Sequence, residues 1–262
     1  MNTIFTYFLG IWKARYFWTH LAFSDLRSRW RRSFFGIFWT IIQPLGLTVL
    51  ISFVFGKIFN TPIREYAPYI LSGIIVWDFI CQCCINGSLC FVQADAYIKQ
   101  CKHPLAIYSL RTTLVNLIIL GFASTSLFLW ILFLFPENFG LSWISLLMAP
   151  IIFILIGWPI ATVLAYFGTI YRDIPHALGL VLQAFWFISP IYFEEKVFRK
   201  GLEFLITYNP IYHLLQIVRA PLLHGQFPTV ANYAYCFGTA LFLIILCLLV
   251  GARKERKIIF YL

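Results

Sequence analysis

Charged residues divide this chain into long uncharged windows, and their spacing predicts membrane-spanning helices. After Arg32 no charged residue follows until Lys57, which leaves 24 neutral positions. A helix needs about 20 apolar residues to cross the hydrocarbon core of a bilayer. Six windows reach this length, although one of them contains a single acid, Asp78. We therefore predict an all-α membrane protein with six transmembrane helices, at about residues 34–56, 67–90, 112–135, 143–170, 175–193 and 229–251.

One further window, between Glu203 and Arg219, has only 15 residues and is interrupted by Asn209-Pro210. Proline inside a helix removes a backbone hydrogen bond. We interpret this window as a pair of half-helices, re-entrant or interfacial, which is allowed where protein or water covers the backbone. It would be the centre of a periplasmic hairpin over residues 194–227, between spans 5 and 6.

The distribution of lysine and arginine predicts the orientation of the spans. Fourteen of the 20 cations fall on the side that holds both termini, and the other six, Arg219 among them, fall on the opposite side. Cytoplasmic loops carry the excess of such cations, so both termini are expected in the cytoplasm. A seventh span through Asn209-Pro210 would move the basic tail across the membrane and remove this asymmetry.

The first 32 residues are predicted to form a cytoplasmic interfacial segment. Aromatic residues are interspersed there with Lys13, Arg15 and His20, as in an amphipathic helix that lies in the membrane surface. With this segment, residues 1–262 form a single transmembrane domain.

Composition agrees with this interpretation. Only 11% of the residues are charged, against about 25% in soluble domains. The net charge of +10 follows from the topology and gives no reason to expect a nucleic-acid partner.

Chemistry-bearing motifs are missing from the sequence. The only Gly-Lys pair, Gly56-Lys57, is followed by Ile58 and so does not complete a phosphate-binding loop, and there is no H-E-x-x-H motif. The "CQCC" run (Cys81, Cys83, Cys84) lacks the paired spacing of a zinc site, and helix packing explains it better. We therefore expect no enzyme, no metal and no cofactor on this chain, and a partner must supply energy for uphill transport.

Two features inside the spans stand out, an acid whose role stays open and a series of small residues. Asp78 is the only acid within a span, and such residues are functional candidates, but it could equally face the bundle interior or water. Small residues recur at roughly helical spacing in the fourth span, where close helix packing is expected; they are Gly157, Ala161, Ala165 and Gly168.

Several stretches resemble the ABC-type polysaccharide export permeases, which move O-antigen, capsule or teichoic-acid polymers linked to a polyprenyl lipid. "SDLRSRWRRSFFGIFWTIIQPL" is similar to the segment that leads into the first span of that family. "LSGIIVWDFI", "ADAYIKQCKHPLAIYSLR" and "YRDIPHAL" follow in the family's order, and so do the "SPIYFEEKVFRKGLEFLITYNPIYHLLQIVRAPLLHG" hairpin and the "RKERKIIFYL" tail. The resemblance covers almost the whole chain.

The resemblance implies partners and roles. It implies a homodimer in the bacterial inner membrane that pairs with two ABC ATPase subunits, which bind the ATP and Mg²⁺. It also implies a gate hairpin around Asn209 and Pro210. The loop between spans 2 and 3 would dock on the ATPase through Tyr97, Ile98, Lys99, Lys102, His103 and Pro104.

Arg27, Arg29, Arg31 and Arg32 have two readings. They lie at the level of the lipid headgroups, where cations set topology and hold anionic lipid. The diphosphate of a polyprenyl-linked glycan would lie at the same depth, and guanidinium groups bind phosphate oxygens in a bidentate manner. Both roles are compatible.

Aromatic residues make up 19% of the chain. Their faces suit the C–H faces of sugars, although lipid contact or an interfacial belt accounts for many of them. The residues that we predict to line a sugar channel are Trp39, Phe185, Trp186 and Tyr192.

Three competing functions are retained. A related ABC permease for a drug or a simple lipid would share the topology. A membrane-embedded polyprenyl or acyl transferase should show carboxylate or histidine clusters, which this sequence lacks. A scaffold protein would need no motif at all.

Overall fold

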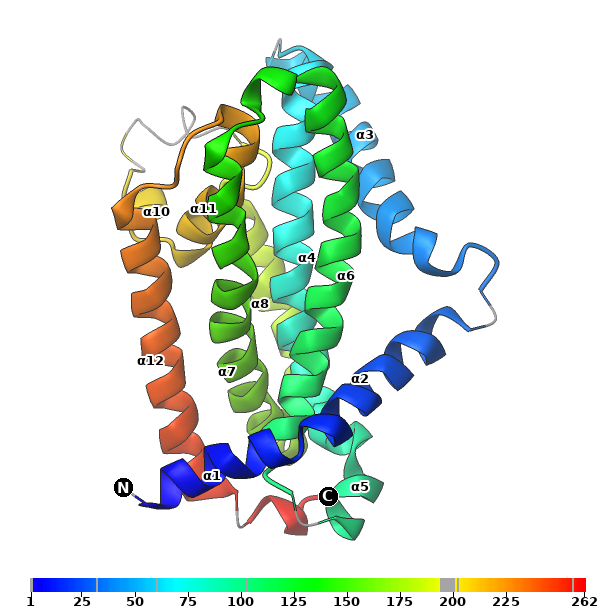
Figure 1. Cartoon of the computed structure of the whole chain (residues 1–262), viewed down its shortest axis with the longest axis vertical. Coiled ribbons are helices and arrows are strands. Elements are labelled where there is room, and N and C mark those ends of the chain that lie inside the picture. Colours follow the sequence, from blue (N-terminus) through cyan, green and yellow to red (C-terminus); the bar gives the residue numbers. More distant parts are fainter. Residues whose placement is uncertain are drawn as a thin grey trace.

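The computed structural model describes residues 2–31, 33–59, 61–101, 103–193, 201, 203–255 and 257–262, and every regular element among them is helical. The all-α prediction is therefore confirmed. The α-helices (Figure 1) are α1 (Asn2–Lys13), α2 (Arg15–Trp30), α3 (Trp39–Phe59), α4 (Ile63–Gln93), α5 (Asp95–Gln100), α6 (Ala106–Leu134), α7 (Ala149–Ile170), α8 (Ile174–Ile188), α10 (Phe204–Thr207), α11 (Pro210–His224) and α12 (Val230–Lys254). Short 3-10 turns accompany them: η1 (Gly36–Phe38), η2 (Pro136–Asn138), η3 (Leu141–Met148) and η4 (Ile258–Phe260).

Five segments of the described chain are long and apolar enough to cross a membrane, which indicates a multi-pass membrane protein. They are Gly36–Phe59, Ile63–Gln93, Ala106–Leu134, Leu141–Ile170 and Val230–Lys254. The remaining predicted span, 175–193, falls on α8, which has only 15 residues. At 1.5 Å per residue α8 measures about 22 Å, less than the hydrocarbon core of about 30 Å. The helix stops because Ser189 is extended, as a residue before proline prefers to be.

The central helix of the bundle is α4. It contacts α3, α6, α7, α8 and α11, and 61% of its apolar window is buried, against 17% for the Gly36–Phe59 span and 11% for α12. Because α4 is covered on most sides, its sequence is apolar around the helix rather than along one face.

Small residues bring α4 and α7 into close contact. A Cβ atom on Gly168 would lie 2.1 Å from the carbonyl oxygen of Ser88, and one on Gly87 would lie 2.7 Å from the Cα of Ala161. A Cβ on Gly157 would meet the Phe79 ring at 2.9 Å. These positions admit no side chain, so the prediction that small residues of this span serve helix packing is confirmed.

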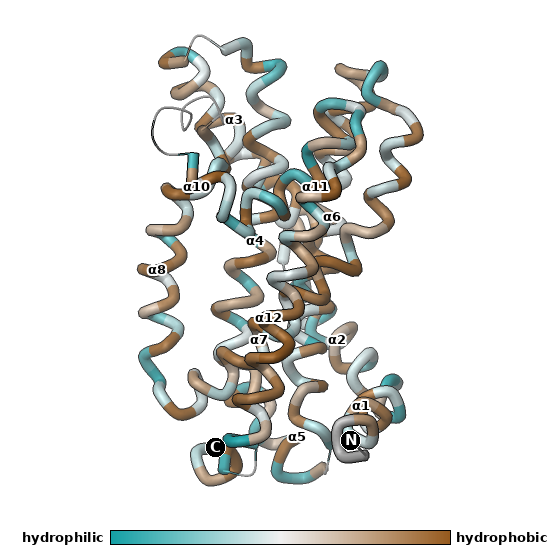
Figure 2. Tube along the Cα trace, turned by 90° about the vertical axis from the view of Figure 1, so that its left-hand side faces the viewer, coloured by the Kyte–Doolittle hydropathy of each residue, from teal (hydrophilic) through white to brown (hydrophobic). Residues whose placement is uncertain are grey.

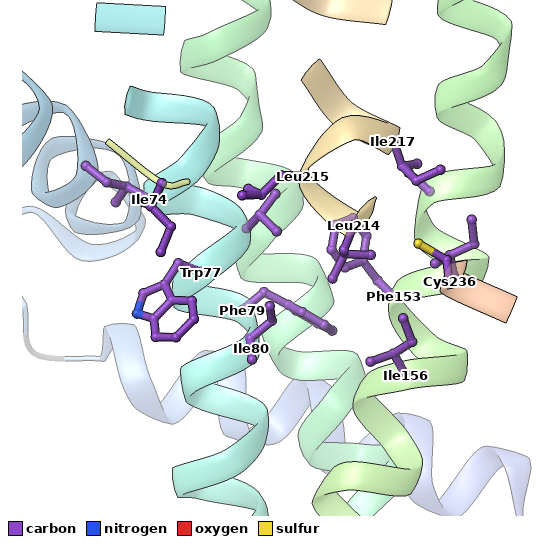
Figure 3. Close-up of a cluster of buried hydrophobic side chains, with 14 of the residues drawn as sticks. Ile74, Trp77, Phe79, Ile80, Phe153, Ile156, Leu214, Leu215, Ile217 and Cys236 are labelled. Carbon is purple, nitrogen blue, oxygen red and sulfur yellow. The ribbon is translucent and has the colours of Figure 1, made fainter. Parts of the chain in front are cut away.

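The main hydrophobic core joins α4 and α7 to α11 and α12 (Figure 3). Trp77 and Phe79 come from α4, Phe153 from α7, and Leu214 and Leu215 from α11, and all five are buried. Cys83 and Cys84 are buried in the same core, which is the packing role expected of them. The α11 helix is therefore enclosed by protein along its inner face.

Both chain termini, α1 and α5 lie at one end of the bundle (Figures 1 and 2). The α1 and α2 helices run across that end, obliquely to the spans (Figure 1). Exposed aromatic side chains on them include Phe5, Trp12, Tyr16 and Phe23. The opposite end carries the α3–α4 connection and η2.

Candidate functional site: a polar cavity beside α2

The arginine cluster occupies the last turn of α2 and the residue that follows it. Arg27, Arg29 and Arg31 are exposed, and Arg32 lies outside the described residues. Of the three, Arg29 lines a cavity at the start of α3, whereas Arg27 and Arg31 do not.

This cavity has a volume of about 170 Å³ and lies between the end of α2, η1, α3, α4 and α6. Its apolar wall includes Ile75, Phe79 and Leu120. Two tryptophans line it as well, Trp30 and the predicted channel residue Trp39. Its polar lining consists of Arg29, Ser33, Thr40, Gln43, Asp78, Gln82 and Asn116.

Asp78 lies in the middle of α4 and faces this cavity. It is exposed at that surface, although its neighbours Trp77 and Phe79 are buried. No lysine, arginine or histidine among the described residues forms an ion pair with it. An unpaired carboxylate at this depth is costly in lipid and is usually functional. Sequence reasoning noted Asp78 but gave it no role, and it overlooked the amides of Gln43, Gln82 and Asn116 that share its cavity.

The other predicted channel residues lie away from this cavity. Trp186 makes an edge contact with Trp77 at 5.7 Å between ring centroids and stacks with Tyr192 at 6.2 Å. Tyr192 is buried, with 6% of its surface exposed, whereas Phe185 on α8 is exposed. Within one chain, Trp186 and Tyr192 belong to a packed aromatic cluster, and their place in a channel stays a prediction.

The predicted coupling segment forms the short helix α5 at the end of the bundle that holds both termini. Ile98 is buried in a hydrophobic cluster at this end of the bundle, whereas Tyr97 is 41% exposed. The ammonium of Lys99 pairs with the Asp95 carboxylate one turn earlier, at 2.9 Å. His103 is exposed and Pro104 half-buried, and Lys102 lies outside the described residues. Ile98 is thus placed to anchor α5 while Tyr97 faces outward.

The α1 and α2 helices hold this segment in place. The Phe17 ring lies 5.0 Å from the His103 ring and 6.2 Å from the Tyr97 ring, between centroids. A Cβ on Gly10 would lie 3.0 Å from the Pro104 ring, so α1 crosses close over the end of the loop. The hydroxyl of Tyr7 accepts a hydrogen bond from the backbone of Ala106 at 3.3 Å. Burial, and secondarily the nearby Glu255 carboxylate, raises the pKa of Tyr7, so this hydroxyl stays protonated.

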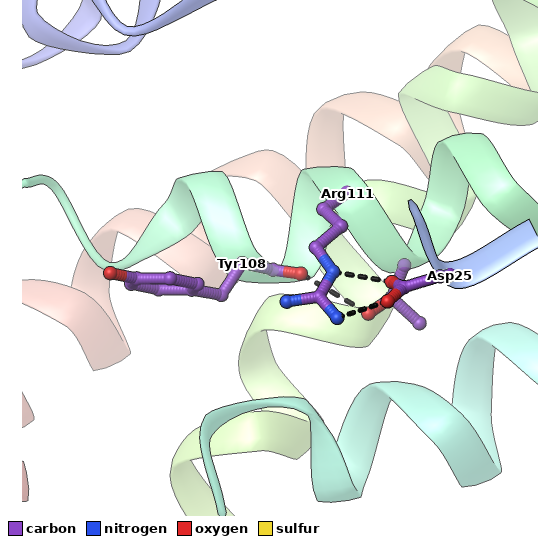
Figure 4. A network of polar contacts seen from close by, with 4 residues as sticks. Asp25, Tyr108 and Arg111 are labelled. Atoms are coloured by element: carbon purple, nitrogen blue, oxygen red, sulfur yellow. Dashed lines mark hydrogen bonds and ion pairs between the residues drawn. The ribbon is translucent and has the colours of Figure 1, made fainter. Parts of the chain in front are cut away.

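An ion pair joins α2 to α6 between the coupling segment and the cavity. The Arg111 guanidinium donates from Nε and Nη2 to both carboxylate oxygens of Asp25 (Figure 4). Further along both helices, α2 packs on α6 through Leu26 with Val115 and through Trp30 with Phe122. A single helix therefore contacts the coupling segment near its start and lines the cavity near its end.

The predicted break at Asn209-Pro210 separates α10 from α11. The side-chain oxygen of Asn209 accepts from the backbone N–H of Ile211 at 2.9 Å, which caps α11. Its amide donates to the hydroxyl of Ser189 at 3.1 Å. Residues 194–200 and Leu202 of the predicted hairpin lie outside the described residues.

Arg219 is the polar centre of this region, a role that sequence reasoning did not foresee when it counted this residue with the cations opposite the termini. It is 1% exposed. Its guanidinium donates to the carbonyls of Pro190, Ile191 and Tyr69 at 2.6, 2.8 and 3.1 Å, and to the hydroxyl of Ser72 at 3.1 Å. It also lies over the Tyr69 ring, 3.7 Å from its centroid. Arg219 therefore ties α11 to α4 and to the turn after α8.

A second polar contact fixes α11 from the other side. The ring of His213 is buried and stacks on Tyr235 of α12 with 4.0 Å between centroids. Its two nitrogens lie 2.9 Å from the side-chain oxygen of Asn232 and 2.9 Å from the carbonyl of Thr207. With Arg219, these contacts make α11 a firmly held part of the bundle.

Comparison with known proteins places these features in a family. The ABC-2 type transporter family matches residues 17–223, most of the chain. The chain is 24% identical over 216 residues to the O-antigen export system permease protein RfbA of Klebsiella pneumoniae, covering 81% of this chain and 80% of that protein. It is 23% identical over 210 residues to the polysialic acid transport protein KpsM of Escherichia coli, with 78% and 80% covered. A protein of the same RfbA name from Myxococcus xanthus is 18% identical over 220 residues, with 79% and 80% covered.

Proposed function

The chain belongs to the ABC-2 type transporter family, and from this premise we propose that it is the permease subunit of a polysaccharide exporter. The polymer, linked to a polyprenyl diphosphate and best matched by an O-antigen, would pass from cytoplasm to periplasm. The observation that carries this proposal is the match, over about four fifths of both chains, to proteins named for O-antigen export and polysialic acid transport.

Six crossings of the inner membrane are part of this proposal. The α7 and α12 helices both end at the end of the bundle that holds the termini (Figure 1). We therefore propose that the chain returns to the opposite side between Ile170 and Val230, with α8 as the apolar helix available for the return. The α8 helix is about 8 Å shorter than the hydrocarbon core, and the turn at Ser189–Phe193 would span the difference. The Asn209-Pro210 hairpin would then re-enter the membrane from the periplasm as a gate. The cation excess supports a cytoplasmic position for both termini.

Two copies of the chain would form the path for the polymer. Among the described residues the interior around α4 is filled with packed side chains, so we expect a single chain to be too narrow for a sugar chain. The α3 helix turns its small residues inward, with Thr48, Ser52 and Gly56 buried, and leaves Leu50 and Phe53 exposed. No residue of α8 is buried. A homodimer formed through such faces would supply a continuous lined channel, in which Trp39 and Phe185 are available as aromatic lining.

A separate ATPase would power the transport. ATP and Mg²⁺ would bind to two copies of that subunit, and this chain would hold no cofactor. The exposed Tyr97 of α5 is suited to contact the ATPase. Movement of α5 would pass through Phe17 to α2, and along α2 to the arginines that receive the diphosphate.

Deletion and complementation test the proposed function. In the bacterium that carries this chain, removing its reading frame should abolish the surface polysaccharide, and lipid-linked glycan should accumulate on the cytoplasmic face. A plasmid copy should restore both. If the polymer persists at the surface while resistance to an apolar drug is lost, the chain is a drug permease and this proposal is wrong.

A further inference from the structure

The cavity beside α2 contains a buried hydrogen-bond acceptor that the fold leaves unused. Asn116 is 3% exposed, and its side-chain oxygen has no hydrogen-bond partner among the described residues. Its amide nitrogen makes only a long contact of 3.7 Å with the Cys83 sulfur. Leaving a buried carbonyl unsatisfied costs about 1–3 kcal/mol, so a ligand that donates a hydrogen bond there would gain from it.

Asp78 and Gln82 extend the polar wall along one face of α4. They are four residues apart and so lie one turn from each other. Asp78 contributes a carboxylate, which only accepts hydrogen bonds when ionised. The Gln82 oxygen already accepts from the amide of Asn86 at 2.7 Å, so its NH₂ group is the part left to donate. This face of α4 therefore presents an acceptor at Asp78 and a donor at Gln82, one helical turn apart.

The opposite wall adds aromatic surface and a further carbonyl. Trp30 and Trp39 line the cavity from the end of α2 and the start of α3. Pro44 in α3 has no backbone N–H, so it cannot donate the usual helical hydrogen bond to the carbonyl of Thr40. Both residues line the cavity. Arg29 stands at the same cavity as a cationic donor.

These groups distinguish a sugar from a phosphate. Ionised phosphate groups carry no donor for Asp78 or the Asn116 oxygen, and the carboxylate would repel them. A pyranose ring presents hydroxyls that both donate and accept, together with C–H faces that stack on tryptophan. A volume of about 170 Å³ suits one such ring better than the drug-sized ligands that occupy pockets of roughly 300–1,000 Å³.

We propose that this cavity binds one sugar ring of the exported polymer, with Asp78 and Asn116 accepting its hydroxyls. The proposal rests on the proposed function, since it names a subsite for that substrate. Arg29 and the Gln82 amide donate to the ring oxygens, and Trp39 stacks on a ring face. The site holds the first sugars beside α2, where movement of α5 reaches them.

Binding is tested on the full-length chain assembled with its ATPase in lipid nanodiscs. The probes are methyl glycosides of glucose, mannose and galactose, followed by saturation-transfer NMR, and inorganic pyrophosphate, followed by its phosphorus line width. At least one glycoside should bind the wild-type chain. Asn116→Leu and Asp78→Asn should each weaken its apparent affinity about tenfold, the ratio expected for one lost hydrogen bond.

Stability separates a binding role from a structural one. Because the Asn116 oxygen is unpaired, Asn116→Leu should leave the melting temperature unchanged or raise it, whereas a structural asparagine would lower it. Gln43→Leu, at an exposed part of the wall, is the second variant and should also weaken binding. Thr125→Val, exposed on α6 outside the cavity, is the matched control and should bind as wild type.

Export by the same variants separates this inference from the proposed function. In the deletion strain, the wild-type chain and Thr125→Val should restore the surface polymer, and Asn116→Leu should restore much less. If wild type restores no polymer, the proposed function itself fails. If wild type exports but Asn116→Leu and Asp78→Asn bind and export normally, the sugar site is refuted. A response to pyrophosphate alone, or no glycoside binding by wild type, also overturns it.

Discussion

Replacing Arg219 should loosen α11 from α4 and from the turn after α8. In Arg219→Leu the guanidinium no longer bonds the carbonyls of Tyr69, Pro190 and Ile191 or the Ser72 hydroxyl. Hydrogen bonds in membrane proteins contribute about 0.6 kcal/mol on average and up to about 1.7. At least four bonds therefore put the expected loss of unfolding free energy at roughly 2–7 kcal/mol. The upper part of that range applies here because the freed carbonyls stay buried.

The chain contains a matched control for this change. Arg64 is exposed and its guanidinium bonds one backbone carbonyl, that of Leu134, at 2.6 Å. Arg64→Leu should therefore cost less than about 1 kcal/mol. Arg219→Lys should fall between wild type and Arg219→Leu, because an ammonium keeps the charge but loses the planar fork.

The assay combines unfolding of the purified protein with local proteolysis. Thermal unfolding in nanodiscs gives the stability difference, and limited trypsin digestion reports whether the hairpin becomes accessible before the spans unfold. In cells, Arg219→Leu should insert and bind the ATPase but export little polymer. The reasoning is refuted if Arg219→Leu and Arg64→Leu unfold alike and show the same digestion pattern.

Three further predictions follow from the same structure. A reporter active only in the periplasm should be silent after Leu262 or within 100–105 and active near Asn138 or Lys200; activity after Leu262 contradicts six crossings. Tyr97→Asp should abolish export while the permease still inserts, because a charge replaces the exposed ring that is suited to contact the ATPase. Normal export with normal ATPase binding would exclude the coupling role of α5. Replacing Arg27, Arg29, Arg31 and Arg32 together with Lys should preserve topology and ATPase assembly. Surface polymer and substrate-stimulated ATP hydrolysis should fall, because the lysine ammonium lacks the planar fork of arginine that matches phosphate. Unchanged export would mean that the cluster only fixes the topology.

Spacing and composition were sufficient to predict features that depend on local chain properties. The windows between charges indicate spanning helices because a bilayer requires a minimum apolar length. Asn209-Pro210 indicates a helix break because proline lacks an N–H, and the structure starts α11 at Pro210. Small residues at helical spacing in α7 indicate close packing, which the contacts of Gly157 and Gly168 confirm.

Tertiary structure alone decided which polar residues share a site. Arg219 borders an apolar window and Asp78 lies inside one. Local sequence offers no way to tell that Arg219 is buried among carbonyls while Asp78 faces a cavity. Asn116, Asp78 and Arg29 lie far apart in the chain and meet because α2, α4 and α6 pack together. The physical reason is that solvation and hydrogen bonding of a polar group depend on its neighbours in space, whereas spanning length and helix breaking depend on its neighbours along the chain.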